Sequence, residues 1–90
     1  MRKRKVKKDQ ITGFAFIKIE PVSRIKPAYE RIRMQDAIVE IHEITGEYDL
    51  LCKISAPDTE SFREALDSIR TAIGVKKVEI MISYHQIKPE

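Results

Sequence analysis

The sequence predicts an α+β domain whose elements follow the order strand, helix, strand, strand, helix, strand. One run of alternating apolar residues near each end of the chain and two near its middle have the period of β-strands. The two segments between them repeat apolar residues every three or four positions, as amphipathic helices do. Residues 44–50 join the middle runs, and Gly46 can adopt the positive φ of a tight hairpin. With right-handed connections this order gives a ferredoxin-like βαββαβ fold, a four-stranded antiparallel sheet with two helices on one face.

The length and composition of the chain predict a single domain and limit the class of protein to which it can belong. Ninety residues are enough for one domain. No apolar run approaches the roughly 18 residues of a transmembrane helix, so we expect no membrane partner. No apolar segment follows the basic N-terminus, which argues against a signal peptide. A single cysteine, Cys52, excludes an internal disulfide and suits a reducing compartment, so we expect a cytoplasmic protein.

The charge is concentrated at the N-terminus. Residues 1–10 contain six basic residues and one acidic residue, a net charge of +5, whereas the other eighty contain 11 basic and 13 acidic residues. We therefore predict a flexible basic arm over residues 1–10 and a folded domain over residues 11–90. The arm is either a disordered, solubilising end or a binder of polyanions. Ten residues cannot form a helix-turn-helix, so sequence-specific DNA binding by this chain alone is not expected.

The first strand, residues 11–20, has apolar residues on both faces. Phe14 and Phe16 point to one side, and the opposite side carries Ala15, Ile17 and Ile19. Two helices cover only one face of such a sheet, so the other face needs cover, which a second copy of the chain can supply. We therefore predict a homodimer through Phe14 and Phe16. The alternative is that the two phenylalanines face the helices.

The next three elements follow from periodicity. Ser23 is the expected N-cap of a helix whose buried stripe comprises Ile25, Ala28, Tyr29 and Ile32. The second strand, residues 36–44, is predicted to turn Ala37, Val39 and Ile41 to the helices, and Glu40 and His42 away from them. The third strand, residues 48–55, places Cys52 on the helix side. Cys52 and His42 are therefore not expected to form a catalytic pair.

The second helix and the last strand complete the pattern. Asp58 is the expected N-cap of the helix, and Gly74 is expected just beyond its end. Its predicted buried stripe comprises Phe62, Ala65, Leu66, Ile69, Ala72 and Ile73. Residues 75–84 form the last strand, with Val78, Ile80, Ile82 and Tyr84 on one face.

Three segments carry a resemblance to a known family. They are residues 14–21 (Phe-Ala-Phe-Ile-Lys-Ile-Glu-Pro), residues 44–54 (Ile-Thr-Gly-Glu-Tyr-Asp-Leu-Leu-Cys-Lys-Ile) and residues 73–75 (Ile-Gly-Val). In this order they resemble the effector-binding domain of the Lrp/AsnC regulators, also known as the regulation-of-amino-acid-metabolism (RAM) domain. The resemblance covers about residues 13–85. It implies dimers that pair through their sheets, assembly into octamers or other rings, and a role in transcription regulation.

The resemblance also implies a ligand site. Family members bind a small effector, often an amino acid, near this hairpin, which assigns ligand contacts to Thr45, Gly46, Glu47, Tyr48 and Asp49. A glycine lets backbone N–H groups approach a carboxylate, and an aspartate can pair with an ammonium group. The alternatives are that Asp49 caps the turn and that Tyr48 packs at an interface.

The chain departs from the family pattern at two places. Many members carry a Thr-x-Thr pair on the last strand, where this chain has Val78 and Ile80. Two apolar side chains at these ligand positions favour an apolar ligand side chain, or no ligand. Typical members also carry a helix-turn-helix, in place of which this sequence has the basic arm. We therefore expect a stand-alone effector domain that modulates full-length Lrp/AsnC regulators.

Other functions remain as alternatives. The first is a nucleic-acid-binding ferredoxin-like module that acts through the basic arm, although its third strand lacks the aromatic residues of an RNA-binding sheet. The second is an enzyme, which we do not expect. No glycine-rich phosphate loop follows the first strand, and His42 and His85 lack metal-ligand spacing. No cofactor or metal is therefore predicted.

Overall fold

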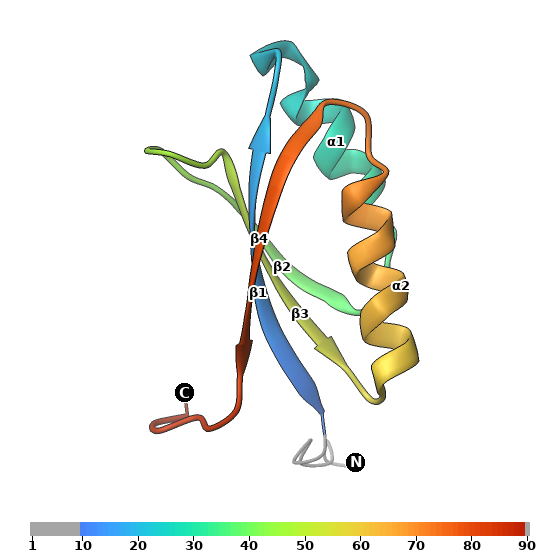
Figure 1. Ribbon diagram of the computed structural model, residues 1–90, viewed down its shortest axis with the longest axis vertical. Helices are drawn as coiled ribbons and strands as arrows, with labels where there is room; N and C mark the ends of the chain where they lie inside the picture. Colours follow the sequence, from blue (N-terminus) through green and yellow to red (C-terminus); the bar gives the residue numbers. More distant parts are fainter. Residues whose placement is uncertain (1–9, 90) are drawn as a thin grey trace, which may run out of the picture.

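The computed structural model describes residues 10–89 and contains one four-stranded antiparallel sheet with both α-helices on the same face (Figure 1). The strands lie in the order β2-β3-β1-β4. The elements are β1 (Ile11–Ile19), the 3-10 turn η1 (Val22–Arg24), α1 (Ile25–Ile32), β2 (Ile38–Glu43), β3 (Leu50–Ala56), α2 (Thr59–Arg70) and β4 (Val75–Ser83). The predicted ferredoxin-like fold is confirmed. The predicted arm lies outside the described residues, apart from Gln10.

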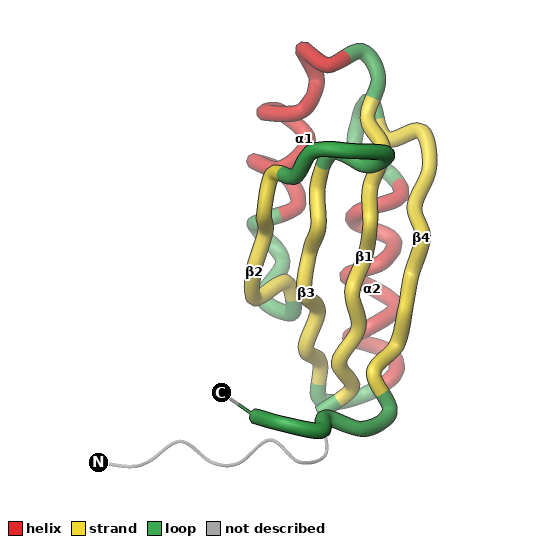
Figure 2. The backbone as a smooth tube through the Cα atoms, turned by 90° about the vertical axis from the view of Figure 1, so that its left-hand side faces the viewer, coloured by secondary structure: helices red, strands yellow, loops and turns green. Residues whose placement is uncertain are grey.

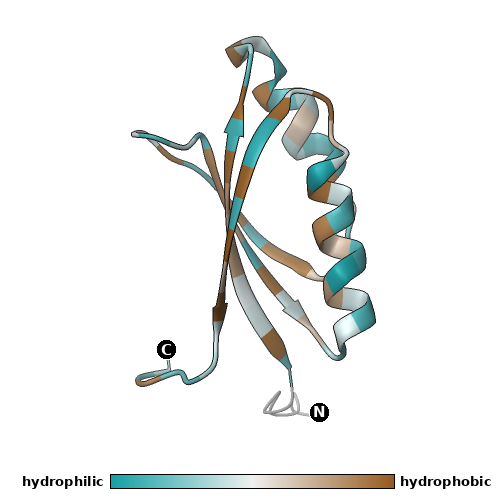
Figure 3. Ribbon diagram, in the orientation of Figure 1, coloured by the Kyte–Doolittle hydropathy of each residue, from teal (hydrophilic) through white to brown (hydrophobic). Residues whose placement is uncertain are grey.

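The core lies between the sheet and the helices. Hydrophobic and hydrophilic stretches alternate along the strands and helices (Figure 3). The fully or almost fully buried side chains include Ala15, Ile17 and Ile19 of β1, Leu50, Cys52 and Ile54 of β3, and Ile32, Ala65 and Ile69 of the helices. Burying an isoleucine stabilises the fold by about 1.5–3 kcal/mol, so this layer accounts for much of the stability. Phe14 and Phe16 lie on the opposite, open face and are half-buried, as the alternation predicted.

The second strand departs from simple alternation. Ile38 pairs with Ile54 and Glu40 pairs with Lys53, so Val39 is an extra residue in a β-bulge. The bulge shifts the pattern by one position. Ile38 is therefore buried, whereas Val39 is 50% exposed. The prediction that Val39 faces the helices was wrong for this reason, whereas Ala37 and Ile41 do pack against the core.

The ends of the helices also differ from the prediction. Helix α1 begins after a 3-10 turn that contains Ser23, and its N-cap is Arg24, so the predicted Ser23 cap was wrong. For α2, the Asp58 carboxylate accepts a hydrogen bond of 2.8 Å from the Ser61 N–H, which confirms that cap. This bond lowers the pKa of Asp58.

The end of α2 explains a second difference. The helix stops at Arg70, so Ile73 lies beyond it and is 61% exposed rather than part of the buried stripe. Gly74 has a φ of +94° and begins the approach to β4, three positions after the C-cap residue Thr71 rather than directly after it. Its carbonyl accepts a hydrogen bond of 2.9 Å from the Glu20 N–H, which joins the ends of β1 and β4.

Candidate functional site

The hairpin between β2 and β3 projects to the side of the sheet that carries no helices (Figure 1). Figure 2 views this open face and shows the hairpin crossing in front of the ends of β3 and β1. Its stem is closed by a 2.9 Å hydrogen bond from the Ile44 N–H to the Asp49 carbonyl. Gly46 has a φ of +111°, and no atom lies within 4 Å of the position its Cβ would occupy. The sequence-predicted positive φ at Gly46 is therefore confirmed, and its backbone is open to solvent.

Tyr48 fixes the hairpin on the open face. Its hydroxyl donates a hydrogen bond of 2.7 Å to the Glu79 carboxylate on β4. Its ring centroid lies 5.8 Å from that of Phe16, in a tilted arrangement, and 5.7 Å from the Lys77 Nζ. The distance to Phe16 is usual for an aromatic pair, and the distance to Lys77 is usual for a cation–π contact. The hydrogen bond to Glu79 raises the pKa of the Tyr48 phenol, because it favours the protonated form.

Asp49 connects the hairpin to the end of β1. Its carboxylate accepts a 2.8 Å hydrogen bond from the Ile19 N–H and lies 3.9 Å from the Lys18 Nζ. Its own N–H donates to the Ile17 carbonyl at 2.8 Å. The side chain of Asp49 is 20% exposed, so one edge of the carboxylate faces solvent. A cationic ligand group could reach this edge while the bond to Ile19 remains.

The remaining predicted ligand residues lie elsewhere. Thr45, Gly46 and Glu47 are exposed at the tip of the hairpin. Val78 and Ile80 pair with Ile17 and Ala15 of β1, two core residues, and pack against the core on the helix side of β4. The structure thus gathers the hairpin residues on the open face but places Val78 and Ile80 on the opposite face.

Sequence reasoning missed two members of this cluster, Lys77 and Glu79. Alternation along β4 does put both on the face opposite Val78, so the face could have been predicted. Their contact with Tyr48 could not, because it depends on the hairpin folding back over the sheet. No local sequence pattern predicts this position of the hairpin.

The open face of the sheet carries an apolar strip. Phe14 pairs with Lys53 of β3 and Met81 of β4, and Phe16 pairs with Leu51 and Glu79. Residues directly opposite in an antiparallel pair have neighbouring side chains on one face. Phe14, Phe16, Leu51 and Met81 therefore form a continuous apolar surface, which we call the open-face strip. It lies beside the hairpin cluster.

The described residues offer little to catalysis or metal binding. None of their His, Cys, Asp and Glu side chains form a group of three that could hold a metal ion. Burial raises the pKa of the Cys52 thiol to about 12, and the side chain is fully buried on the helix side. His42 is exposed on the face away from the helices, as predicted. Its ring lies 3.0 Å from the Glu40 carboxylate. None of the helices described is long and apolar enough to span a membrane.

Comparison with known proteins identifies relatives with this architecture. The chain is 33% identical over 82 residues to an uncharacterised HTH-type transcriptional regulator of Pyrococcus abyssi. The alignment covers 88% of this chain and 55% of the relative. The chain thus spans about half the length of this relative.

Solved structures share the fold at lower identity. Escherichia coli AsnC superposes with a TM-score of 0.85 at 17% identity, over 100% of this chain and 63% of AsnC. A protein of Thermus thermophilus gives a TM-score of 0.79 at 24% identity, over 88% of this chain and 99% of that protein. A Neisseria meningitidis regulator in complex with L-Met gives 0.76 at 20% identity, over 88% and 53% of the two chains.

The curated relatives of this chain include HTH-type transcriptional regulators, and also homocitrate synthases of Saccharolobus islandicus, which are 28% identical over 68 residues, 76% of this chain and 15% of each enzyme. The family model described as the Lrp/AsnC ligand binding domain matches residues 12–90, almost the whole folded part of the chain. This chain therefore belongs to the Lrp/AsnC ligand-binding domain family, as the three sequence segments indicated.

Proposed function

We propose that this chain is an effector-binding domain that dimerises through its open face, binds an amino acid beside the hairpin, and modulates transcription regulators. One observation carries the proposal: the Thr-Gly-Glu-Tyr-Asp hairpin lies over an apolar sheet face that has no helix to cover it. A second copy on that face would bring two hairpins to the edges of the shared surface. A small effector bound there would touch both subunits and so alter their assembly.

The open-face strip supports the dimer. Phe14 and Phe16 are half-buried and Met81 is 52% exposed, although all three are large apolar side chains. A contiguous apolar surface of this kind on a small domain usually marks an interface. Larger rings would need further contacts between dimers, outside this strip.

The chemistry of the hairpin supports an amino-acid effector. The backbone at Gly46 is open to a ligand carboxylate, and the exposed edge of the Asp49 carboxylate can pair with an ammonium group. The Neisseria relative was solved with L-Met bound. Val78 and Ile80 face the helices, so they would not contact a ligand bound beside the hairpin on the open face.

The same surface supports a mode of regulation. A full-length regulator with the same domain carries the same kind of open face, so the two chains can form a mixed dimer. Forming a mixed dimer takes regulator chains out of their own dimers, which are the form suited to a two-fold symmetric operator. The amino acid would then set how much of the regulator is in the mixed form.

Light scattering with a panel of amino acids tests this function. We expect a parent species at a multiple of the 10.5 kDa chain mass, and a change of size or thermal stability with one amino acid of the panel. Substituting Asp49→Asn, which removes the charge proposed to meet the ammonium group but keeps an acceptor for the Ile19 N–H, should remove the response. A parent protein that runs as a single chain at micromolar concentration contradicts the proposal.

A nucleic-acid-binding role of the basic arm is a second candidate, favoured by the net charge of +5 in residues 1–10. Binding of this kind weakens steeply with salt and does not depend on sequence. A salt titration with and without residues 1–10 separates it from binding by the sheet. Loss of all affinity without those residues assigns binding to the arm alone.

A further inference from the structure

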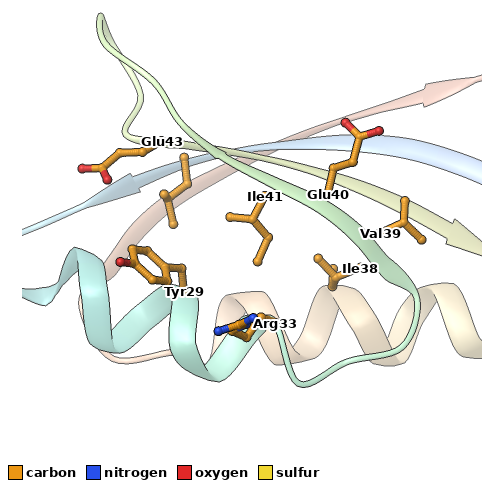
Figure 4. A pocket seen from close by; sticks show the side chains of 8 residues that line it. Tyr29, Arg33, Ile38, Val39, Glu40, Ile41 and Glu43 are labelled. Atoms are coloured by element: carbon orange, nitrogen blue, oxygen red, sulfur yellow. The ribbon is translucent and has the colours of Figure 1, made fainter.

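A groove of about 500 Å³ separates α1 from the edge strand β2 (Figure 4). It is lined by residues of α1, β2 and β3: Tyr29, Arg33, Ile38, Val39, Glu40, Ile41, Glu43 and Leu50. Figure 4 shows Tyr29, Ile38 and Ile41 turned into the space between helix and strand, and Glu40 turned away from it. The volume lies within the usual range of small-molecule pockets.

The β-bulge accounts for this groove. Because Val39 is the extra residue of the bulge, it turns outward and leaves only Ile38 and Ile41 as apolar side chains of β2 on the helix side. Helix α1 is also short, at eight residues, while the longer α2 packs on β3 and β4. Ile38, Ile41 and Leu50 therefore give the groove an apolar floor, and Tyr29 and Arg33 of α1 form its other wall.

The side chains that line the groove carry more negative than positive charge: Arg33 against Glu40 and Glu43. Arg33 is already engaged, with its guanidinium 3.6 Å from the Glu30 carboxylate. Glu40 is held on the other face of β2 by His42 at 3.0 Å. Glu43 follows Ile41 by two residues and so shares its face. Within residues 10–89, its carboxylate makes no hydrogen bond or ion pair with another side chain.

We propose that the groove between α1 and β2 binds a small hydrophobic amine. The alkyl part lies on Ile38 and Ile41, the ammonium group meets the Glu43 carboxylate, and the Tyr29 ring lies beside it. A single unpaired carboxylate above an apolar floor complements a cation with an apolar body, and an aromatic ring adds attraction for that cation. The lining holds two carboxylates, of Glu40 and Glu43, and one arginine that already lies 3.6 Å from the Glu30 carboxylate, so it favours a cation over an anion.

This site is distinct from the one proposed at the hairpin. The groove opens on the helix side of the sheet, at the β2 edge, whereas Tyr48 and the open-face strip lie on the other side. It also selects a different chemistry, an amine rather than an amino acid. Neither proposal depends on the other.

Calorimetric titration of the full chain with three probes of one shape tests the inference: isopentylamine, isopentanol and isovalerate. We expect the amine to bind about tenfold more tightly than the alcohol, the effect of one charge-assisted hydrogen bond, and the acid to bind least. Substituting Glu43→Gln should reduce the affinity for the amine to that for the alcohol. Substituting Tyr29→Leu should reduce the preference for the amine and leave the alcohol almost unchanged.

Two control variants make the result specific. Glu60→Gln removes the same charge from the first turn of α2, outside the lining of the groove, and should leave the affinity for the amine unchanged. Asp49→Asn, at the hairpin, should also leave it unchanged. The proposal is overturned if the parent gives no saturable heat with the amine, or if Glu43→Gln binds it as the parent does. Loss of amine binding in Asp49→Asn with retention in Glu43→Gln overturns it too, because the amine then occupies the hairpin.

Discussion

The hydroxyl of Tyr48 donates a 2.7 Å hydrogen bond to the carboxylate of Glu79, 31 positions further along the chain. Glu79 lies on β4, so this bond spans the sheet across β1 and fastens the hairpin to the far edge strand. The position of the hairpin therefore depends on a residue that belongs to neither of the strands it joins.

Removing this hydroxyl should loosen the hairpin without unfolding the domain. In Tyr48→Phe the ring still packs on Phe16, but the bond to Glu79 is lost. We expect faster amide hydrogen exchange in residues 45–48 and little change in melting temperature, because the bond is exposed. Exchange equal to that of the parent would show that the bond does not hold the hairpin.

The same bond predicts a pH dependence. The raised pKa of Tyr48 means that the folded state favours the neutral phenol. The anchoring is therefore fully present below the ordinary tyrosine pKa and is lost as the pH rises through the raised value. Absorbance titration of the parent minus Tyr48→Phe should show this high pKa, and Glu79→Gln should move it back toward the ordinary value.

Two substitutions at Asp49 distinguish its structural role from its proposed role in ligand binding. In Asp49→Ala the buried Ile19 N–H loses its acceptor, so the free energy of unfolding should fall by about 1–3 kcal/mol in urea titrations. Asp49→Asn keeps an acceptor but removes the charge, so its stability should stay nearer to that of the parent. Both variants should lose the amino-acid response. An Asp49→Asn protein that responds like the parent would exclude the ammonium contact.

The open-face strip should control dimerisation. Phe16→Glu places a charge in its centre, so we expect light scattering to give the 10.5 kDa mass of one chain. A matched control is Val22→Glu, because Val22 is 72% exposed but lies outside the sheet. If Val22→Glu also dissociates the protein, the interface is not the strip.

Cys52 should be unreactive until the domain unfolds. Its thiol is fully buried and has a pKa raised to about 12, so almost none is thiolate at neutral pH. Labelling with a disulfide reagent should be slower than labelling of the unfolded chain by about the equilibrium constant for opening the core. Fast labelling at neutral pH would show that this part of the core is open.

Strand periodicity was enough to predict the fold, because burial on one face imposes a period of two on β1 and β3. It failed at Val39, since a bulge inserts one residue into β2 and nothing in the local sequence marks it. It also failed at Ile73, which repeats the helical pattern although α2 has already ended.

The hairpin site was only partly predictable. Gly46 was identifiable because a positive φ favours glycine, and Asp49 because of the family motif. The bonds from Tyr48 to Glu79 and from Asp49 to Ile19 join residues distant in sequence. Such contacts depend on how the hairpin tilts over the sheet, which composition and periodicity do not determine.

The pair formed by Glu43 and Leu50 closes the stem of the hairpin, and the same two side chains line the groove beside α1. The two proposed ligands would thus contact opposite sides of the sheet beside one residue pair. If the amine changes the affinity for the amino acid by some factor, thermodynamic linkage requires the amino acid to change the affinity for the amine by the same factor.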